Sequence, residues 1–163
     1  MTRVKLLEDL KNLCVEATEH LMLPTAVQKG DTNVETRPPD VYKMRLPDSN
    51  DYKKKAPYMI IQYVQGRQKQ GIEPENSAVV RIIFCVYSDD EQVGSTMLLN
   101  VMDCVEHKLM KNVVVGDQYH LDVENGIESL VYTDDTAPYY GAEITCTFYL
   151  PEILRKGVQN EYI

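Results

Sequence analysis

Residues 78–88, with the sequence AVVRIIFCVYS, constrain the fold more than any other stretch of the chain. Almost every position is apolar and most are β-branched or aromatic, which predicts a strand rather than a helix. Side chains of a strand point alternately to its two faces, but here both faces are apolar, because Arg81 is the single charged residue. Such a strand is either central in a sheet covered on both sides, or it meets another protein with one face. The sequence leaves both possibilities open.

Two amphipathic helices are predicted. The first begins after Thr2, a residue that can cap it, carries leucines at helical spacing, and is expected to stop before Pro24. The second follows the run Ser-Asp-Asp-Glu at residues 88–91, where a cap and several acids favour a helix start, and continues to about residue 111 or 112.

The remaining pattern predicts short strands joined by turns. They are expected at residues 42–46, 58–65, 78–88, 113–115, 119–123, 127–133 and 139–150. The order predicts an α+β fold, with a mainly antiparallel (mixed) sheet and two helices packed on one of its faces. We expect one domain over residues 1–163, with a long loop-rich insertion at 25–57 and a polar C-terminal tail at 152–163.

Composition excludes several classes of function. The formal net charge of -8 argues against a nucleic-acid-binding surface, which needs clustered Lys and Arg. Uncharged apolar runs fall short of the roughly 20 residues that a membrane helix needs, and the first residues do not predict a signal peptide. The four cysteines lie in apolar segments without metal-ligand spacing, which is typical of reduced, buried cysteines in the cytosol.

No motif predicts a catalytic, cofactor-binding or metal site. The frame from Gly66 to Gly71 has the glycine spacing of a phosphate loop, but Ile72 and Glu73 stand where Lys and Ser or Thr are required. The three histidines lie on separate elements without a second ligand at helical spacing. A cap and a turn explain the Asp-Asp pairs at 89–90 and 134–135. The sequence therefore favours a protein that is not an enzyme.

Signals for protein interaction are stronger. Most of the 11 tyrosines fall on predicted strands or their ends, and tyrosine is favoured in interfaces. The densest positive charge, at residues 53–55 with Arg67 and Lys69, gathers at one end of the first predicted hairpin. The alternative interpretation of the tyrosines is that they line the more solvent-exposed face of the sheet. The alternative interpretation of the basic residues is that they only make the loops soluble.

Three segments carry a resemblance to a known family. They are APYMIIQYVQG at residues 56–66, SAVVRIIFCVYSDDE at 77–91 and TDDTAPYYGAEITCTFYLPEI at 133–153. A proline-led strand, a polar hairpin, a strand running into an acid-capped helix, and a closing Pro-Tyr-Tyr-Gly strand occur in this order. Over about residues 4–151 the chain resembles the tail terminator (tail-completion) proteins of tailed bacteriophages and related prophage particles.

The resemblance implies a structural role in a virion tail, assembled in the bacterial host cytoplasm. Such proteins form a ring, commonly of six copies, at the head-proximal end of the tail tube. The ring ends tube polymerisation, offers a joining surface to the neck, and lets DNA pass through its lumen. It implies no cofactor and no membrane; the implied partners are further copies of the chain, the tail tube protein, and sheath and neck or connector proteins.

Two sets of residues are candidates for these contacts. We expect the hairpin loop at residues 65–71, with Gln65, Arg67, Gln68 and Lys69, to contact the tube or the neighbouring subunit. We expect Tyr139 and Tyr140 to lie near a subunit boundary. The alternatives are another neck or head-completion adaptor of the same particle, and a cytosolic α+β enzyme or ligand-binding domain.

Overall fold

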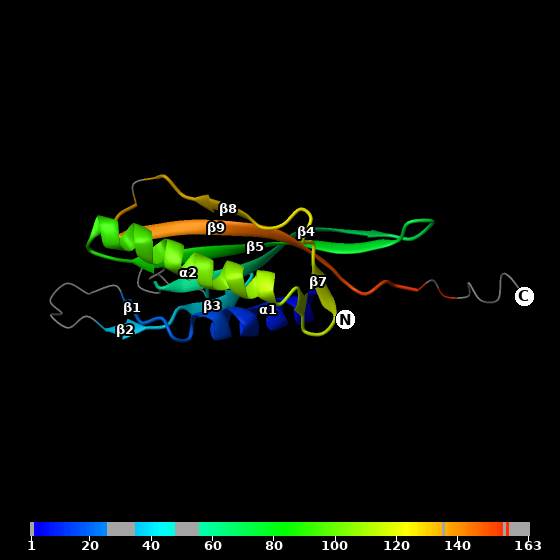
Figure 1. Ribbon diagram of the computed structural model, residues 1–163, viewed down its shortest axis with the longest axis horizontal. Coiled ribbons are helices and arrows are strands. Elements are labelled where there is room, and N and C mark those ends of the chain that lie inside the picture. Colours follow the sequence, from blue (N-terminus) through cyan, green and yellow to red (C-terminus); the bar gives the residue numbers. More distant parts are fainter. Residues whose placement is uncertain (1, 26–34, 48–55, 135, 155, 157–163) are drawn as a thin grey trace, which may run out of the picture.

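The computed structural model describes residues 2–25, 35–47, 56–134, 136–154 and 156 (Figure 1). Within these residues the chain forms two helices and nine strands. Their bounds are α1 Arg3–Thr18, β1 Leu23–Pro24, β2 Thr36–Arg37, β3 Asp40–Lys43, β4 Tyr58–Lys69, β5 Glu75–Tyr87, α2 Glu91–Lys111, β6 Val114–Val115, β7 Tyr119–Leu121, β8 Glu128–Val131 and β9 Tyr139–Tyr149.

One mixed sheet organises the molecule. Its order is β3-β4-β5-β9-β7-β6, and β8 pairs with β9 beside β7. Only β3 and β4 are parallel; the other pairs within this sheet are antiparallel. The strand predicted at residues 78–88 is β5, which lies centrally between β4 and β9. The predicted α+β fold, with a mainly antiparallel sheet, is confirmed.

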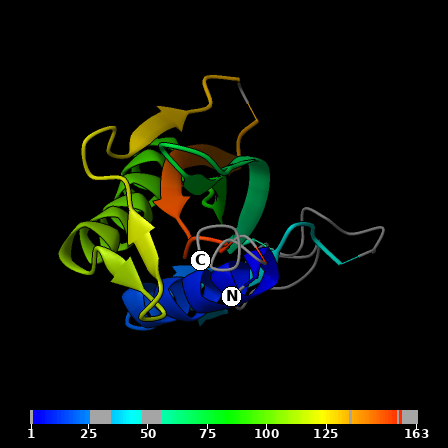
Figure 2. The same ribbon diagram turned by 90° about the vertical axis from the view of Figure 1, so that its right-hand side faces the viewer.

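The two helices pack side by side on one face of the sheet (Figures 1 and 2). The Thr2 hydroxyl caps α1 by accepting from the Lys5 amide at 3.1 Å. The Asp90 carboxylate caps α2 by accepting from the amides of Gln92 at 3.0 Å and Val93 at 3.3 Å. Such caps satisfy amides that have no partner within the helix, so they fix where each helix begins.

The core lies between the helices and this face of the sheet. Every second residue of β5 and β9 points into it and is buried, as are the apolar stripes of both helices. The core residues of the two strands are Ala78, Val80, Ile82, Phe84, Val86, Ala142, Ile144, Cys146 and Phe148. Burying a side chain of the size of Ile or Phe stabilises the fold by about 1.5–3 kcal/mol.

The predicted boundaries agree with the structure in part. Helix α1 ends at Thr18, which agrees with the predicted stop before Pro24, and a short connection leads from it to β1. The edge strand expected at 42–46 is β3, Asp40–Lys43, and it ends where Met44 adopts a positive φ of 66°. Within the predicted insertion at 25–57, residues 26–34 and 48–55 lie outside the described residues. Of the predicted tail, Glu152 to Leu154 and Lys156 are described and have no regular secondary structure.

Candidate functional site

The two faces of β5 have different surroundings. Its core-facing residues are 0–1% exposed from Val80 to Val86. The opposite side, here called the open face, carries the alternate residues of β5, from Val79 to Tyr87, which are only half-buried. No helix in the described part of the chain covers the open face (Figure 2). This face therefore retains apolar surface that the fold itself does not bury.

The hairpin of β4 and β5 extends beyond the rest of the sheet (Figure 1). We call its outer part the arm: residues 64–69 of β4, 70–74 of the turn and 75–79 of β5. Every arm residue on β4 is exposed. The register shifts between Tyr63 and Gln65, so that Val64 has no partner on β5 and forms a bulge at the base of the arm. Bulges bend a strand and increase its twist, so Val64 sets the direction of the arm.

The predicted contact residues lie on the two sides of the arm. Pairing of Gln65 with Val79, Arg67 with Ser77 and Lys69 with Glu75 places those three β4 residues on the open face. Gln68 pairs with Asn76 and points to the other side. These residues were expected in a loop, but β4 continues through Lys69 and the connecting turn is shorter.

The positive charge of the arm is accessible. The Arg67 Nε lies 3.7 Å from the Glu75 carboxylate, and the Arg67 side chain is 69% exposed. An exposed ion pair of this kind contributes little free energy, because water screens it. Both Arg67 and Lys69 can therefore meet a negatively charged partner at small cost.

The segment after β9 continues outward beside the arm. The Asn76 side-chain amide donates to the Pro151 carbonyl at 2.9 Å, and the Leu150 amide donates to the Asn76 carbonyl at 2.8 Å. Further out, the Gln70 side chain donates to the Ile153 carbonyl at 3.1 Å. A shallow hollow of about 290 Å³ lies between this segment and the arm. Two large apolar side chains are exposed in the same two segments: Ile72 in the turn of the arm, and Leu154, which follows Ile153 in the chain.

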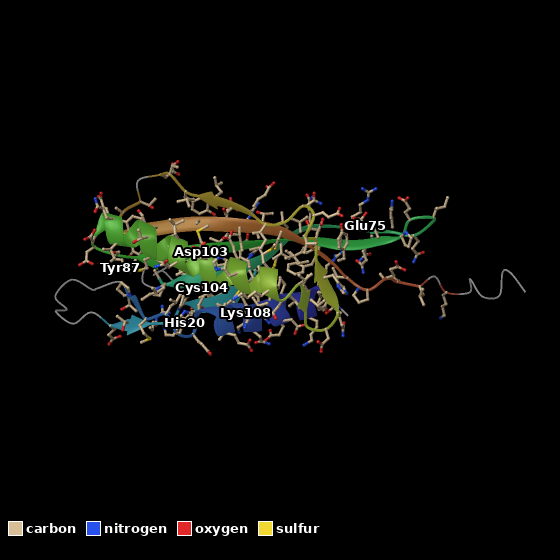
Figure 3. The ribbon with its side chains drawn as sticks, viewed as in Figure 1. His20, Glu75, Tyr87, Asp103, Cys104 and Lys108 are labelled. Carbon is tan, nitrogen blue, oxygen red and sulfur yellow. The ribbon has the colours of Figure 1, made fainter. Side chains whose placement is uncertain are left out.

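The two predicted tyrosines lie at the other end of the sheet and point to opposite faces. Tyr139 lies on the open face, where its ring centre is 5.5 Å from that of Tyr87. Tyr140 packs against the core, and its ring lies so close to Gly94 of α2 that a Cβ there would meet it at 2.3 Å. Glu75 and Tyr87 mark the two ends in Figure 3; the 12 steps of β5 between them span about 40 Å.

A hollow of about 580 Å³ lies beside Tyr139 on the open face. Tyr58, Ile83, Cys85 and Tyr132 contribute to its lining. Burial raises the pKa of the Tyr58 phenol far above its usual value and also raises the pKa of the Cys85 thiol. Both groups are therefore neutral near pH 7, and the hollow offers apolar contact and hydroxyl groups rather than a base or a nucleophile.

A second thiol lies between the helices. The Cys104 sulfur on α2 is 3.9 Å from Nε2 of His20, and Asp103 and Lys108 lie nearby on the same helix (Figure 3). Burial, followed by the charge of Asp103, raises the pKa of the Cys104 thiol, which disfavours the thiolate. Among the described residues, no cluster of three or more His, Cys, Asp or Glu could hold a metal ion.

A strand was predicted at residues 127–133, but β8 was not among the candidate contact surfaces. All four of its residues are exposed, including Leu130 at 58% and Val131 at 42%. Through Glu143, Leu130 is aligned with the open face, and so is Glu128 through Thr145. The predicted strand at 127–133 contained the signal, because two adjacent apolar residues cannot both face a core on one strand.

Comparison with known proteins adds no relative. No protein-family model matches the chain, and no curated protein matches it at the threshold applied. Among the described helices, none has the length and apolar character needed to cross a membrane.

Proposed function

We propose that this chain is a structural subunit of a bacteriophage-type tail. In this proposal, copies of it form a ring, commonly of six, that caps the head-proximal end of the tail tube. The ring ends polymerisation of the tube and presents a surface to the neck. The resemblance of residues 4–151 to tail terminator proteins motivates the proposal.

The observation that carries it is the arm. All of its β4 side chains are exposed, whereas its β5 side is paired with β9 and with Leu150 as far as Asn76. A contact with another protein would bury the exposed surface of β4. The exposed apolar residues Ile72 and Leu154 at the same end support an assembly role.

Two further features support the ring. The sheet has unlike borders, with the arm and β3 on one side and β6 and β8 on the other, and a closed ring needs unlike surfaces that fit each other. The net charge of -8 is compatible with a lumen along which DNA slides without adhering.

The proposal is tested by measuring the mass of the protein by light scattering over a dilution series, with negative-stain images of the same samples. Tubes assembled from the tube protein of the same particle are then incubated with it. Rings of about six copies, together with binding at one end of the tubes, are expected. A protein that stays monomeric at all concentrations and leaves tube ends unbound would contradict the proposal. Binding only to the neck side would favour the adaptor alternative.

A further inference from the structure

We propose that the outer edge of β4 in the arm of one copy pairs, antiparallel, with the free edge of β8 in the next copy. This inference rests on the proposed ring and names the contact that closes it. Two free strand edges, matching charges and the strand directions support it.

The first free edge belongs to β8. In the described part of the chain this strand pairs with β9 alone, over Glu128 to Val131. Its other edge presents backbone amides and carbonyls to solvent, beside the exposed side chains of Leu130 and Val131. An exposed apolar edge of this kind readily accepts a further strand.

The second free edge belongs to the arm. Strand β3 covers β4 only from Tyr58 to Ile61. Beyond β3, the Met44 sulfur accepts from the backbone amide of Tyr63 on β4. From Val64 to Lys69, no described strand lies on the outer side of β4. A further strand on this side would pair backbone groups of β4 that no described strand pairs.

Charge complementarity selects a second copy as the occupant. Arg67 and Lys69 project from the open face of the arm, and Glu128 projects from the open face of β8. If the open faces of the two copies are continuous, antiparallel pairing can place Lys69 beside Glu128 and Arg67 beside Leu130. Opposite charges on neighbouring strands favour this register, whereas like charges would oppose it.

Strand direction also fits. Strand β8 is antiparallel to β9, β9 to β5 and β5 to β4, so β8 runs opposite to β4 within one chain. A neighbour related by rotation about a ring axis parallel to the strands keeps its direction, and its arm would meet β8 antiparallel. Each copy then uses one edge to donate and another to accept, which is the arrangement that closes rings.

The two edges lie at different levels of the sheet. Through β9 and β5, Glu128 is level with Arg81, whereas Lys69 is level with Glu75. Six steps of β5 separate these levels, a stagger of about 20 Å. Sheets that close on themselves have strands tilted by about 35–45°, and this tilt produces such a stagger between neighbours.

The test is disulfide cross-linking of the full chain carrying Lys69→Cys and Glu128→Cys together. Cysteines opposite each other on neighbouring strands fall within the distance that a disulfide needs. After mild oxidation, a non-reducing gel should show a ladder of covalent multimers that ends at the stoichiometry of the ring. Each single variant should give dimers at most, and Lys111→Cys with Glu128→Cys is the matched double control. Arg67→Cys with Glu128→Cys tests the register shifted by two residues.

A charge exchange gives an independent readout. Lys69→Glu should raise the concentration needed for half-assembly about fivefold or more, and adding Glu128→Lys should restore it. Rings that form without a ladder from either cysteine pair would overturn the strand pairing and leave the proposed function standing. Absence of rings, of ladders and of tube-end binding would overturn both. Cross-links from Lys69→Cys to added tube protein, instead of to Glu128→Cys, would assign the arm to the tube and overturn the inference.

Discussion

The inner and outer halves of the hairpin formed by β4 and β5 are joined across the bulge at Val64 but differ in what surrounds them. In the inner half, Ile61, Ile82 and Phe84 are fully buried against the helices. In the outer half, every residue of β4 from Val64 to Lys69 is exposed. Backbone pairing continues through both halves up to Lys69 and Glu75.

The difference teaches that pairing and burial have separate roles in this sheet. A backbone hydrogen bond contributes only about 0.5–1.5 kcal/mol net, because it replaces bonds to water. The inner half is fixed by its apolar side chains, and its substitutions should appear in the stability of the monomer. The outer half contributes little to that stability, and its substitutions should appear in assembly.

Truncation of the inner half should have the largest effect. Phe84→Ala removes a fully buried ring from the centre of the core, and we expect a loss of about 3–5 kcal/mol in the free energy of unfolding in urea. Ile72→Ala, at a fully exposed position on the arm, should change it by less than about 0.5 kcal/mol. Equal losses in the two variants would remove the distinction between the halves.

The contact between α2 and Tyr140 should have the next largest effect. Gly94→Ala places a Cβ within 2.3 Å of the Tyr140 ring, so the helix or the ring must move, at a cost of about 1–3 kcal/mol. Tyr140→Leu in the same chain should recover part of the loss. Thermal unfolding measures both variants. A gain in stability from Gly94→Ala alone, as expected for an exposed helical glycine, would contradict the close packing.

Removal of the cap of α2, the helix that covers the inner half, should lower the stability by a smaller amount. Asp90→Ala leaves the amides of Gln92 and Val93 without their acceptor, and we expect a loss of about 1 kcal/mol in urea unfolding. Asp89→Ala, at the exposed neighbouring position, is the control and should be nearly neutral.

Acid should weaken the connection between β7 and β8. Hydrogen bonds from the Asn125 side chain and amide, and from the Tyr149 phenol, hold the pKa of Asp122 below its usual value. A lowered folded-state pKa stabilises the fold above the ordinary carboxyl pKa, and this stabilisation disappears as the pH falls through the folded-state pKa. Unfolding midpoints between pH 7 and about pH 3 should therefore fall less in Asp122→Asn than in the native chain.

Substitution of the basic pair on the arm should have the smallest effect on stability. Arg67→Gln with Lys69→Gln should leave the unfolding free energy within about 0.5 kcal/mol of the native value. The same variant should weaken ring assembly in light scattering. Arg45→Gln with Lys111→Gln removes one Arg and one Lys from other exposed positions and should assemble normally. Equal assembly of both double variants would contradict a role for the arm.

The fold was predictable where residues alternate between apolar and polar or recur at helical spacing. Strand β5, strand β9 and both helices follow from such patterns. The arm was predicted as a loop, because Gln65, Gly66 and Gln68 carry no signal of burial and only backbone pairing extends β4 through them. The opposite directions of Tyr139 and Tyr140 follow from alternation on β9, but which of the two meets the helices depends on where α2 packs.

The bulge at Val64 has a consequence in terms of gene sequence. Strand β4 uses 12 residues to pair with 11 residues of β5, so Val64 is the one that the ladder does not need. An in-frame deletion of its codon would keep Arg67 opposite Ser77 and Lys69 opposite Glu75 while straightening the strand. Such an allele would carry an arm with unchanged chemistry aimed in a different direction. This deletion separates the effect of the direction of the arm from the effect of its side chains.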